Sequence, residues 1–160
     1  MKLYFLRHAT AARDAASDEL RELTEVGRIE ARTAGDALAR MGVKPGAILT
    51  SPLVRARQTA ELAAQALNIS DEITVVAELA NDATTAQLLK ALKPFTAHAE
   101  LVLVGHLPSF PEYIATLTGS ASPNALHLGK GAIACVQLNS LTPGGGTLRW
   151  LMGKKQLGLI

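Results

Sequence analysis

Four short apolar runs, separated by longer stretches rich in alanine, constrain the fold of this chain more than any other feature of its sequence. The runs are Leu3–Leu6, Ala47–Thr50, Ile73–Val76 and Leu101–Val104. Short runs that are apolar throughout are typical of strands covered on both faces, as in parallel sheets. Because the stretches between them have the length of helices, the alternation predicts an α/β fold with a largely parallel sheet.

Local signals indicate where the helices begin and end. Thr24 is the expected N-cap of a helix that runs to Met41 and stops at Gly42, with apolar positions from Val26 to Met41 at helical spacing. Ser51-Pro52 has the signature of a helix start, with serine as N-cap and proline in the first turn. That helix is expected to reach Leu67, and further helices are expected over residues 85–92 and 111–117.

Two late apolar segments complete the predicted sheet. Ile133–Leu138 and Thr147–Met152 are joined by a proline- and glycine-rich turn at residues 143–146. Their closeness in sequence predicts an antiparallel pair at or near an edge. The whole pattern predicts a three-layer α/β/α sandwich, with residues 1–160 forming one domain.

Composition narrows the classes of function. The 160 residues include 16 basic and 14 acidic side chains, a net charge of +2, and only 4% are aromatic. A nucleic-acid groove built on charge and base stacking is therefore not expected. One cysteine, Cys135, and four histidines argue against a disulfide and against a zinc site. No apolar run resembles a signal peptide or a membrane span, so we expect a cytoplasmic protein without a membrane partner.

Polar residues follow three of the predicted strands at the point where each strand ends. They are Arg7-His8, the segment from Ser51 to Arg55, and Gly105-His106. In an open α/β sheet the ligand crevice lies outside the carboxyl ends of the strands. We therefore expect two arginines and two histidines to meet at one edge of the sheet.

Phosphate chemistry suits this set of side chains. Guanidinium groups bind phosphoryl oxygens bidentately, and Arg55 lies in the expected first turn of a helix, where free N–H groups also favour an anion. Positive neighbours should lower the pKa of a histidine between them and keep it neutral. A neutral imidazole has a lone pair that can attack phosphorus, and a second histidine can donate a hydrogen bond to the phosphoryl oxygens.

Four motifs carry a resemblance to a known family. In order and spacing, Leu6-Arg7-His8-Ala9, Leu23-Thr24-x-x-Gly27, the run from Ser51 through Arg55 to Thr59, and Val104-Gly105-His106 resemble the histidine phosphatase (phosphoglycerate mutase-like) superfamily. The short length is most similar to its phosphohistidine phosphatase branch. The resemblance implies a phosphoglycerate mutase-like fold, a nucleophilic His8, and a phosphate pocket completed by Arg7, Arg55 and His106. Ala9 stands where the family more often has glycine.

The resemblance leaves the proton donor open. Members of the wider superfamily often carry a glutamate just after the third strand, where Glu78 lies, and Asp82 is the second candidate. A phosphohistidine substrate would relax the need for a donor, because its imidazole can leave as a neutral molecule.

The segment between the third and fourth strands bears on the substrate. Residues 77–99 leave no room for the large cap that relatives with small substrates often carry there, so we expect an open site. We expect a phosphatase without cofactor or metal, acting on a phosphorylated protein such as a histidine phosphotransfer domain. The alternatives are a phosphomonoesterase for a small phosphate ester and a non-catalytic module that binds phosphorylated partners.

Overall fold

The computed structural model describes residues 1–69 and 73–158, whose strands form a six-stranded sheet in the order β3-β2-β4-β1-β5-β6. The parallel strands are β1 (Lys2–Arg7), β2 (Ala47–Thr50), β3 (Ile73–Val75) and β4 (Glu100–Gly105). The antiparallel strands are β5 (Ile133–Leu138) and β6 (Gly146–Met152), and β6 forms one edge. The α/β class, the mostly parallel sheet and the antiparallel pair at an edge are confirmed.

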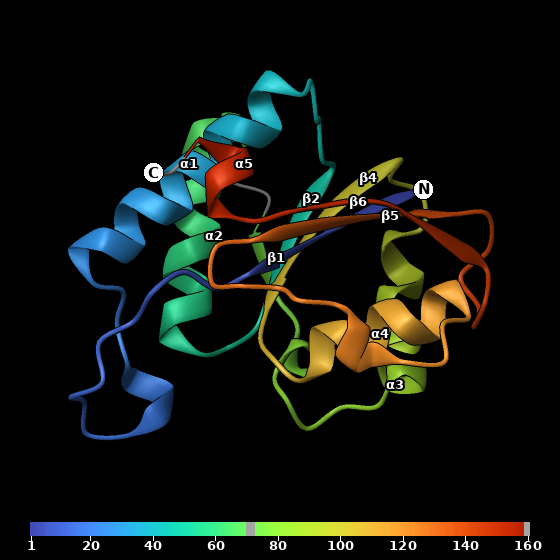
Figure 1. Ribbon diagram of the computed structural model, residues 1–160, viewed down its shortest axis with the longest axis horizontal. Helices are drawn as coiled ribbons and strands as arrows, with labels where there is room; N and C mark the ends of the chain where they lie inside the picture. The colour runs from blue at the N-terminus through green and yellow to red at the C-terminus, as the bar shows by residue number, and fades with distance from the viewer. Residues whose placement is uncertain (70–72, 159–160) are drawn as a thin grey trace.

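Helices cover both faces of this sheet (Figure 1). One face carries α1 (Glu25–Arg40), α2 (Val54–Leu67) and the short α5 (Lys154–Leu157), and the other carries α3 (Thr85–Leu92) and α4 (Ser109–Thr118). The described loops between these elements also contain short 3-10 helices: η1 (Asp18–Leu20), η2 (Ala77–Leu79), η3 (Lys93–Phe95) and η4 (Pro123–Ala125). The three-layer arrangement follows from the strands' apolar residues, which need covering on both sides.

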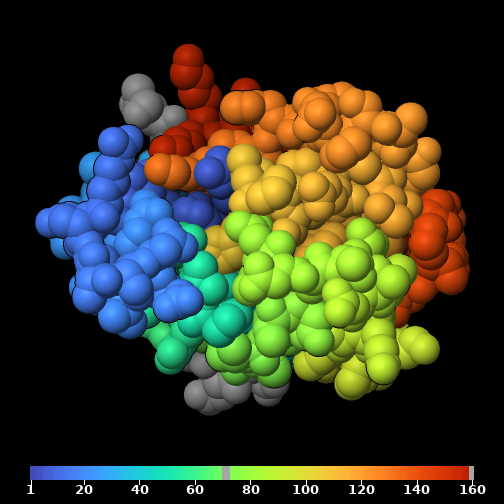
Figure 2. All heavy atoms as spheres, turned by 90° about the horizontal axis from the view of Figure 1, so that it is seen from below, coloured from blue at the N-terminus to red at the C-terminus, as the bar shows by residue number. Residues whose placement is uncertain are grey.

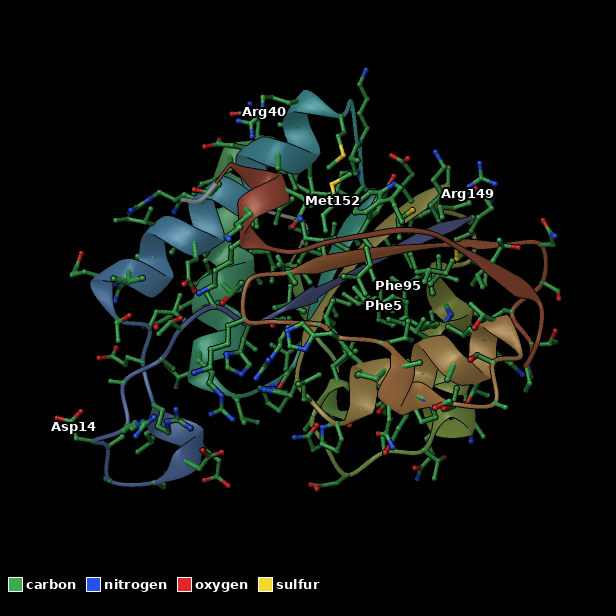
Figure 3. The ribbon with its side chains drawn as sticks, viewed as in Figure 1. Phe5, Asp14, Arg40, Phe95, Arg149 and Met152 are labelled. Atoms are coloured by element: carbon green, nitrogen blue, oxygen red, sulfur yellow. The ribbon has the colours of Figure 1, made fainter. Side chains whose placement is uncertain are left out.

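The two halves of the core differ in the size of their side chains. On the side of α3 and α4, large residues fill the space, and Phe5 packs edge-on against Phe110 with ring centroids 5.1 Å apart. Figure 3 labels Phe5 and Phe95 on this side of the sheet. On the other side, α1 and α2 pack closely through small residues; a Cβ on Gly35 would collide with Ala63. The small alanine side chains thus allow α1 and α2 to pack side by side on one face of the sheet.

The helix predicted to follow Thr24 is confirmed, although Val26, Ile29 and Met41 are exposed by 60, 55 and 41%, because α1 packs through its alanine side. Two expectations about local structure are wrong. The third strand is an edge strand rather than one covered on both faces, and Val75 is 53% exposed.

The second error concerns Ser51. The helix after β2 begins at Val54, with Leu53 as N-cap, so Ser51 does not cap it. Thr24, by contrast, caps α1 as predicted and accepts a hydrogen bond from the Gly27 amide at 3.0 Å.

Candidate active site

The register of the sheet brings the three polar clusters together at the carboxyl ends of the central strands. Arg7, the last residue of β1, pairs with Gly105 at the end of β4. The ladder continues one residue further, because the His8 amide donates to the Gly105 carbonyl at 2.9 Å and the Ser51 amide donates to the Val104 carbonyl at 2.9 Å. The rings of His8 and His106 consequently lie side by side, with centroids 5.0 Å apart and an angle of 50° between their planes.

The carboxyl ends of these strands point toward the lower part of Figure 1, and Figure 2 shows the molecule from that side. There, atoms of the N-terminal loop (blue), of the segment near residue 50 (teal), of the segment near residue 80 (green) and of the segment after β4 (yellow) border one another. Figure 3 places Asp14 at the outer side of the N-terminal loop. Segments far apart in the sequence thus surround the ends of the central strands.

His8 is held as a neutral ring with a defined proton. Its Nδ1 lies 2.8 Å from the Ala9 carbonyl oxygen, which can only accept, so Nδ1 carries the proton and Nε2 keeps its lone pair. Burial lowers the pKa of His8 to about 3, and the charges of the neighbouring His106, Arg55 and Arg7 lower it further, against the effect of the Ala9 hydrogen bond. The sequence predicted the direction of this shift, but burial rather than positive charge is its main cause. At neutral pH the ring can act as a nucleophile.

The two arginines are fixed by different parts of the chain. Arg7 Nη1 donates to the Leu128 carbonyl at 3.0 Å. Arg55, in the first turn of α2, donates from Nη1 to the Asp18 carbonyl at 2.7 Å and from Nη2 to the Asp18 carboxylate at 3.0 Å. Hydrogen bonds from Arg21 and Arg55 lower the pKa of Asp18. No sequence motif indicates Asp18, because its contact with Arg55 spans 37 residues.

Three buried side-chain nitrogens at this edge have no hydrogen-bond partner within the described part of the chain. They are Arg7 Nε, Arg55 Nε and His106 Nδ1. Buried polar atoms are nearly always paired, so three together indicate a place where a ligand supplies the partner. Both arginine atoms can only donate, which fits an anion with several acceptor oxygens.

The motif Leu23-Thr24-x-x-Gly27 supports the segment that follows His8. The Thr10 carbonyl accepts hydrogen bonds from the Thr24 amide at 3.0 Å and from the Thr24 hydroxyl at 3.3 Å. A Cβ on Gly27 would fall onto that same carbonyl, so only glycine allows α1 to approach this closely. The sequence identified this motif by resemblance, and the structure shows its physical role.

Two further residues belong to this support, Thr59 of the third motif and Glu30, and only Glu30 was not identified from the sequence. Glu30 is 2% exposed, and its carboxylate accepts from the Thr10 amide at 2.8 Å, from the Thr10 hydroxyl at 3.0 Å and from Lys154. Thr59 accepts from the Ala9 amide at 3.1 Å. A polar residue on the apolar side of a predicted helix, as Glu30 is in α1, is the signal that could have identified it.

The structure places Glu78 beside the second histidine's loop. Glu78 lies half-buried in η2, directly after β3, and its carbonyl accepts from the Tyr113 hydroxyl at 2.9 Å. Asn81 ties the same segment to the Leu107 carbonyl at 2.7 Å and to Ser109 at 2.8 Å. Asp82 is exposed in the following turn. Of the two carboxylates, Glu78 is therefore the one in the segment packed against Gly105 and the start of the His106 loop.

Other classes of site find little support in residues 1–69 and 73–158. These residues contain no group of three or more His, Cys, Asp or Glu side chains placed to hold a metal ion. None of their helices has both the length and the apolar character to cross a bilayer. Cys135 is buried in β5, and burial raises the pKa of its thiol, as expected for an unreactive cysteine. Between β3 and β4 the chain forms only η2, α3 and η3, so no large cap covers the site.

Comparison with known proteins agrees with this geometry. The sequence pattern of the histidine phosphatase superfamily (branch 1) matches residues 3–84. Phosphohistidine phosphatase SixA of Escherichia coli is 32% identical over 154 residues, which cover 95% of this chain and 93% of that protein. An uncharacterised protein of Picosynechococcus sp. is 37% identical over 137 residues, or 83% of this chain and 82% of that protein.

Comparison of the fold with solved structures indicates the same family. A structure of the protein histidine phosphatase SixA in complex with tungstate superimposes with a TM-score of 0.90 at 31% identity, covering 98% of this chain and 99% of that one. The predicted phosphoglycerate mutase-like fold without a large insertion is thereby confirmed. The chain belongs to the histidine phosphatase superfamily and is a hydrolytic phosphatase of that family.

Proposed function

We propose that this protein, acting as a single histidine phosphatase domain over residues 1–160, removes phosphate from phosphohistidine on a protein of a signalling pathway. In this proposal His8 forms a covalent phosphohistidine intermediate. The observation that carries it is a set of three buried nitrogens, Arg7 Nε, Arg55 Nε and His106 Nδ1, that have no partner among the described residues and lie around a histidine with a free lone pair. Tungstate is a tetrahedral oxyanion like phosphate, so the SixA complex with tungstate supports an oxyanion as the ligand.

The reaction has two displacements at phosphorus. In the first, the Nε2 lone pair of His8 forms a bond to phosphorus while the bond from phosphorus to the leaving group breaks. Arg7, Arg55 and His106 hold the phosphoryl oxygens as charge develops on them. In the second, a water oxygen attacks the phosphorus of the phosphohistidine, the bond to Nε2 breaks, and inorganic phosphate leaves with the proton that water gives up.

Three features favour a phosphohistidine substrate on a protein. An imidazole protonated on its other nitrogen departs as a neutral molecule, whereas an alkoxide needs a positioned acid. The short connection between β3 and β4 leaves the site open to a side chain on another protein. Basic residues also gather beside the site; the charges of Arg7, Arg21 and Arg13, together with burial, lower the pKa of Lys130. Such a rim favours an acidic partner surface.

We assign Glu78 as the proton donor for substrates with poor leaving groups, with Asp82 as the alternative. Support for Glu78 comes from its half-buried place in η2 against the loop that follows β4, whereas Asp82 is exposed. The assignment predicts that Glu78 matters for esters and little for phosphohistidine.

The test is a comparison of turnover on a phosphohistidine protein and on a panel of alkyl and aryl phosphomonoesters, in EDTA. We expect kcat/KM to be highest for the phosphohistidine protein and unaffected by EDTA, since the arginines and histidines neutralise the phosphoryl group. A higher kcat/KM for one small ester would favour the phosphomonoesterase alternative. Tight binding of the phosphoprotein without turnover would favour the binding module. Loss of activity in EDTA that a divalent ion restores would contradict the mechanism.

A further inference from the structure

A buried hydroxyl next to His106 takes no part in the chemistry described above. Ser51 is fully buried directly after β2, and its Oγ lies 2.7 Å from His106 Nε2. We propose that Ser51 is a positioning residue that keeps the proton of His106 on Nδ1, so that Nδ1 donates to the phosphoryl group. The inference rests on the proposed function for the role of His106 as a donor to phosphate.

The hydrogen bonds of Ser51 determine the direction of its contact with His106. A serine hydroxyl carries one proton and two acceptor lone pairs. Within the described residues, Oγ contacts only the Leu53 amide, at 3.3 Å, and His106 Nε2. Because the amide can only donate, Nε2 is the one acceptor available to the hydroxyl proton. The opposite arrangement would bury the Ser51 proton without an acceptor, which buried polar groups rarely tolerate.

The protonation state of the His106 ring determines which tautomer this contact implies. Burial, followed by the charge of Arg55, lowers the pKa of His106 to about 4, so the ring is neutral and carries one proton at neutral pH. With Nε2 accepting from Ser51, that proton is on Nδ1. Nδ1 is buried and has no partner in residues 1–69 and 73–158, and the same holds for Arg7 Nε and Arg55 Nε. All three atoms are then donors, whereas a lone pair on Nδ1 would repel a phosphoryl oxygen.

The backbone fixes the hydroxyl in place. Thr50 pairs with Val104 in the ladder between β2 and β4, and the Ser51 amide extends that ladder to the Val104 carbonyl at 2.9 Å. His106 lies two residues beyond Val104. Because both residues are held by the ends of neighbouring strands, the Oγ to Nε2 contact needs no mobile side chain to form it.

The first test reads the tautomer in the unaltered protein. ¹⁵N NMR of histidine-labelled protein at neutral pH distinguishes a protonated ring nitrogen from a bare one, and a His106→Asn sample assigns the signals. We expect a protonated Nδ1 and a bare Nε2 in His106. A protonated Nε2 would overturn the proposal, and this readout depends on no variant of Ser51.

The second test compares Ser51→Ala with Thr50→Val, which removes the neighbouring buried hydroxyl that donates to the Ser51 carbonyl at 3.2 Å. We expect Ser51→Ala to release the tautomer preference and to lower kcat by about 10-fold or more, with the 10²–10³-fold cost of losing a preorganised donor as the upper limit. Thr50→Val should keep the parental tautomer and kcat. Parental kcat in Ser51→Ala would overturn the role of Ser51. If the parent hydrolyses no phosphorylated compound while His106 is protonated on Nδ1, the proposed function fails and the tautomer assignment stands.

Discussion

At the scale of single residues, the site depends on the geometry of one arginine side chain and on the proton position of one histidine. Arg55 presents a planar fork whose two Nη atoms bind Asp18, while its Nε has no partner in the part of the chain that the structure describes. Lysine would keep the charge but not this geometry. His8 presents a lone pair because the Ala9 carbonyl fixes its proton. The chemistry therefore depends on the placement of protons and lone pairs as much as on charge.

Arg55→Lys should lower kcat/KM by about 10- to 100-fold, the cost of losing one charge-assisted hydrogen bond, and Arg55→Ala should lower it further. Both variants should also weaken the binding of inorganic phosphate, measured by calorimetry. Arg57→Ala is the control, because Arg57 is exposed on the same helix two residues later. Equal effects at the two positions would show that only the net charge of α2 matters.

Glu78→Gln should separate substrates by their leaving groups. A positioned general acid contributes about 10²–10⁴-fold, so we expect a loss of that order in kcat/KM on alkyl phosphates. The loss should be smaller on nitrophenyl phosphate and small on phosphohistidine, whose leaving groups need little protonation. Equal losses on all three substrates would indicate a structural role, and no loss on any would leave Asp82 or solvent as the donor.

At the scale of elements, the first helix and the segment after His8 form one unit. Thr24, Gly27 and Glu30 all lie at the N-terminal half of α1 or just before it, and all three contact Thr10. The Thr10 amide, hydroxyl and carbonyl are thus each bonded to that region. α1 therefore has a second function besides covering the sheet, since it fixes the backbone that orients the His8 ring.

Gly27→Ala tests this unit. The new methyl group would overlap the Thr10 carbonyl, so we expect a loss of about 1–3 kcal/mol in the free energy of unfolding, as for overpacking, together with a lower kcat. Gly42→Ala is the matched control, because Gly42 has φ +74° and open space around it. Its cost is about 1 kcal/mol from backbone strain, with kcat unchanged. A parental kcat in Gly27→Ala, measured by turnover well below its melting temperature, would contradict the coupling.

The positions of the site residues on these elements show which of them can be predicted from the sequence. The strand ends carrying Arg7, His8 and His106 could be predicted because apolar runs mark strands and parallel strands end at one edge. The roles of Asp18 and Ser51 could not, because both depend on contacts between segments far apart in the sequence. Ser51 was misread for the same reason: a local helix-start pattern fitted it, but its hydroxyl pairs with a histidine 55 residues away.

At the scale of the whole molecule, the strand order explains both the site and the errors of the sequence analysis. β1 and β4 are adjacent at the centre of the sheet, and β2 lies next to β4, so the ends that carry His8, His106 and Ser51 meet. β3 falls at the edge, which leaves Val75 exposed although its run is as apolar as the others. Apolar content alone distinguishes strands from loops but not central strands from edge strands.

Two buried neutral histidines also make the stability of the whole molecule depend on pH. Burial lowers the pKa of His8 to about 3 and of His106 to about 4, while the unfolded chain titrates near its ordinary value of about 6.5. The unfolded state therefore binds protons first as the pH falls. The contribution of the two neutral rings to the free energy of unfolding is therefore fully present above about pH 6.5. It should fall toward pH 4, by about 1.4 kcal/mol per pH unit for each histidine.

Urea unfolding between pH 7.5 and 4.5 measures this dependence. The double variant His8→Asn, His106→Asn is the reference, because it keeps every other titrating group and cancels their contributions. We expect the free energy of unfolding to fall more steeply with acidity in the parent than in the double variant. Parallel curves would show that the two rings are not held neutral by the fold.

The central claim is that phosphate passes through His8, and trapping the intermediate tests it most directly. The protein is mixed with a phosphohistidine protein, quenched in alkali within the first turnovers, and digested for mass spectrometry under conditions that preserve phosphohistidine. The account predicts phosphate on the peptide containing His8, appearing and disappearing with turnover, and neither phosphate nor turnover in His8→Ala. Turnover by His8→Ala comparable to the parent, or phosphate carried on His106 instead, would contradict it.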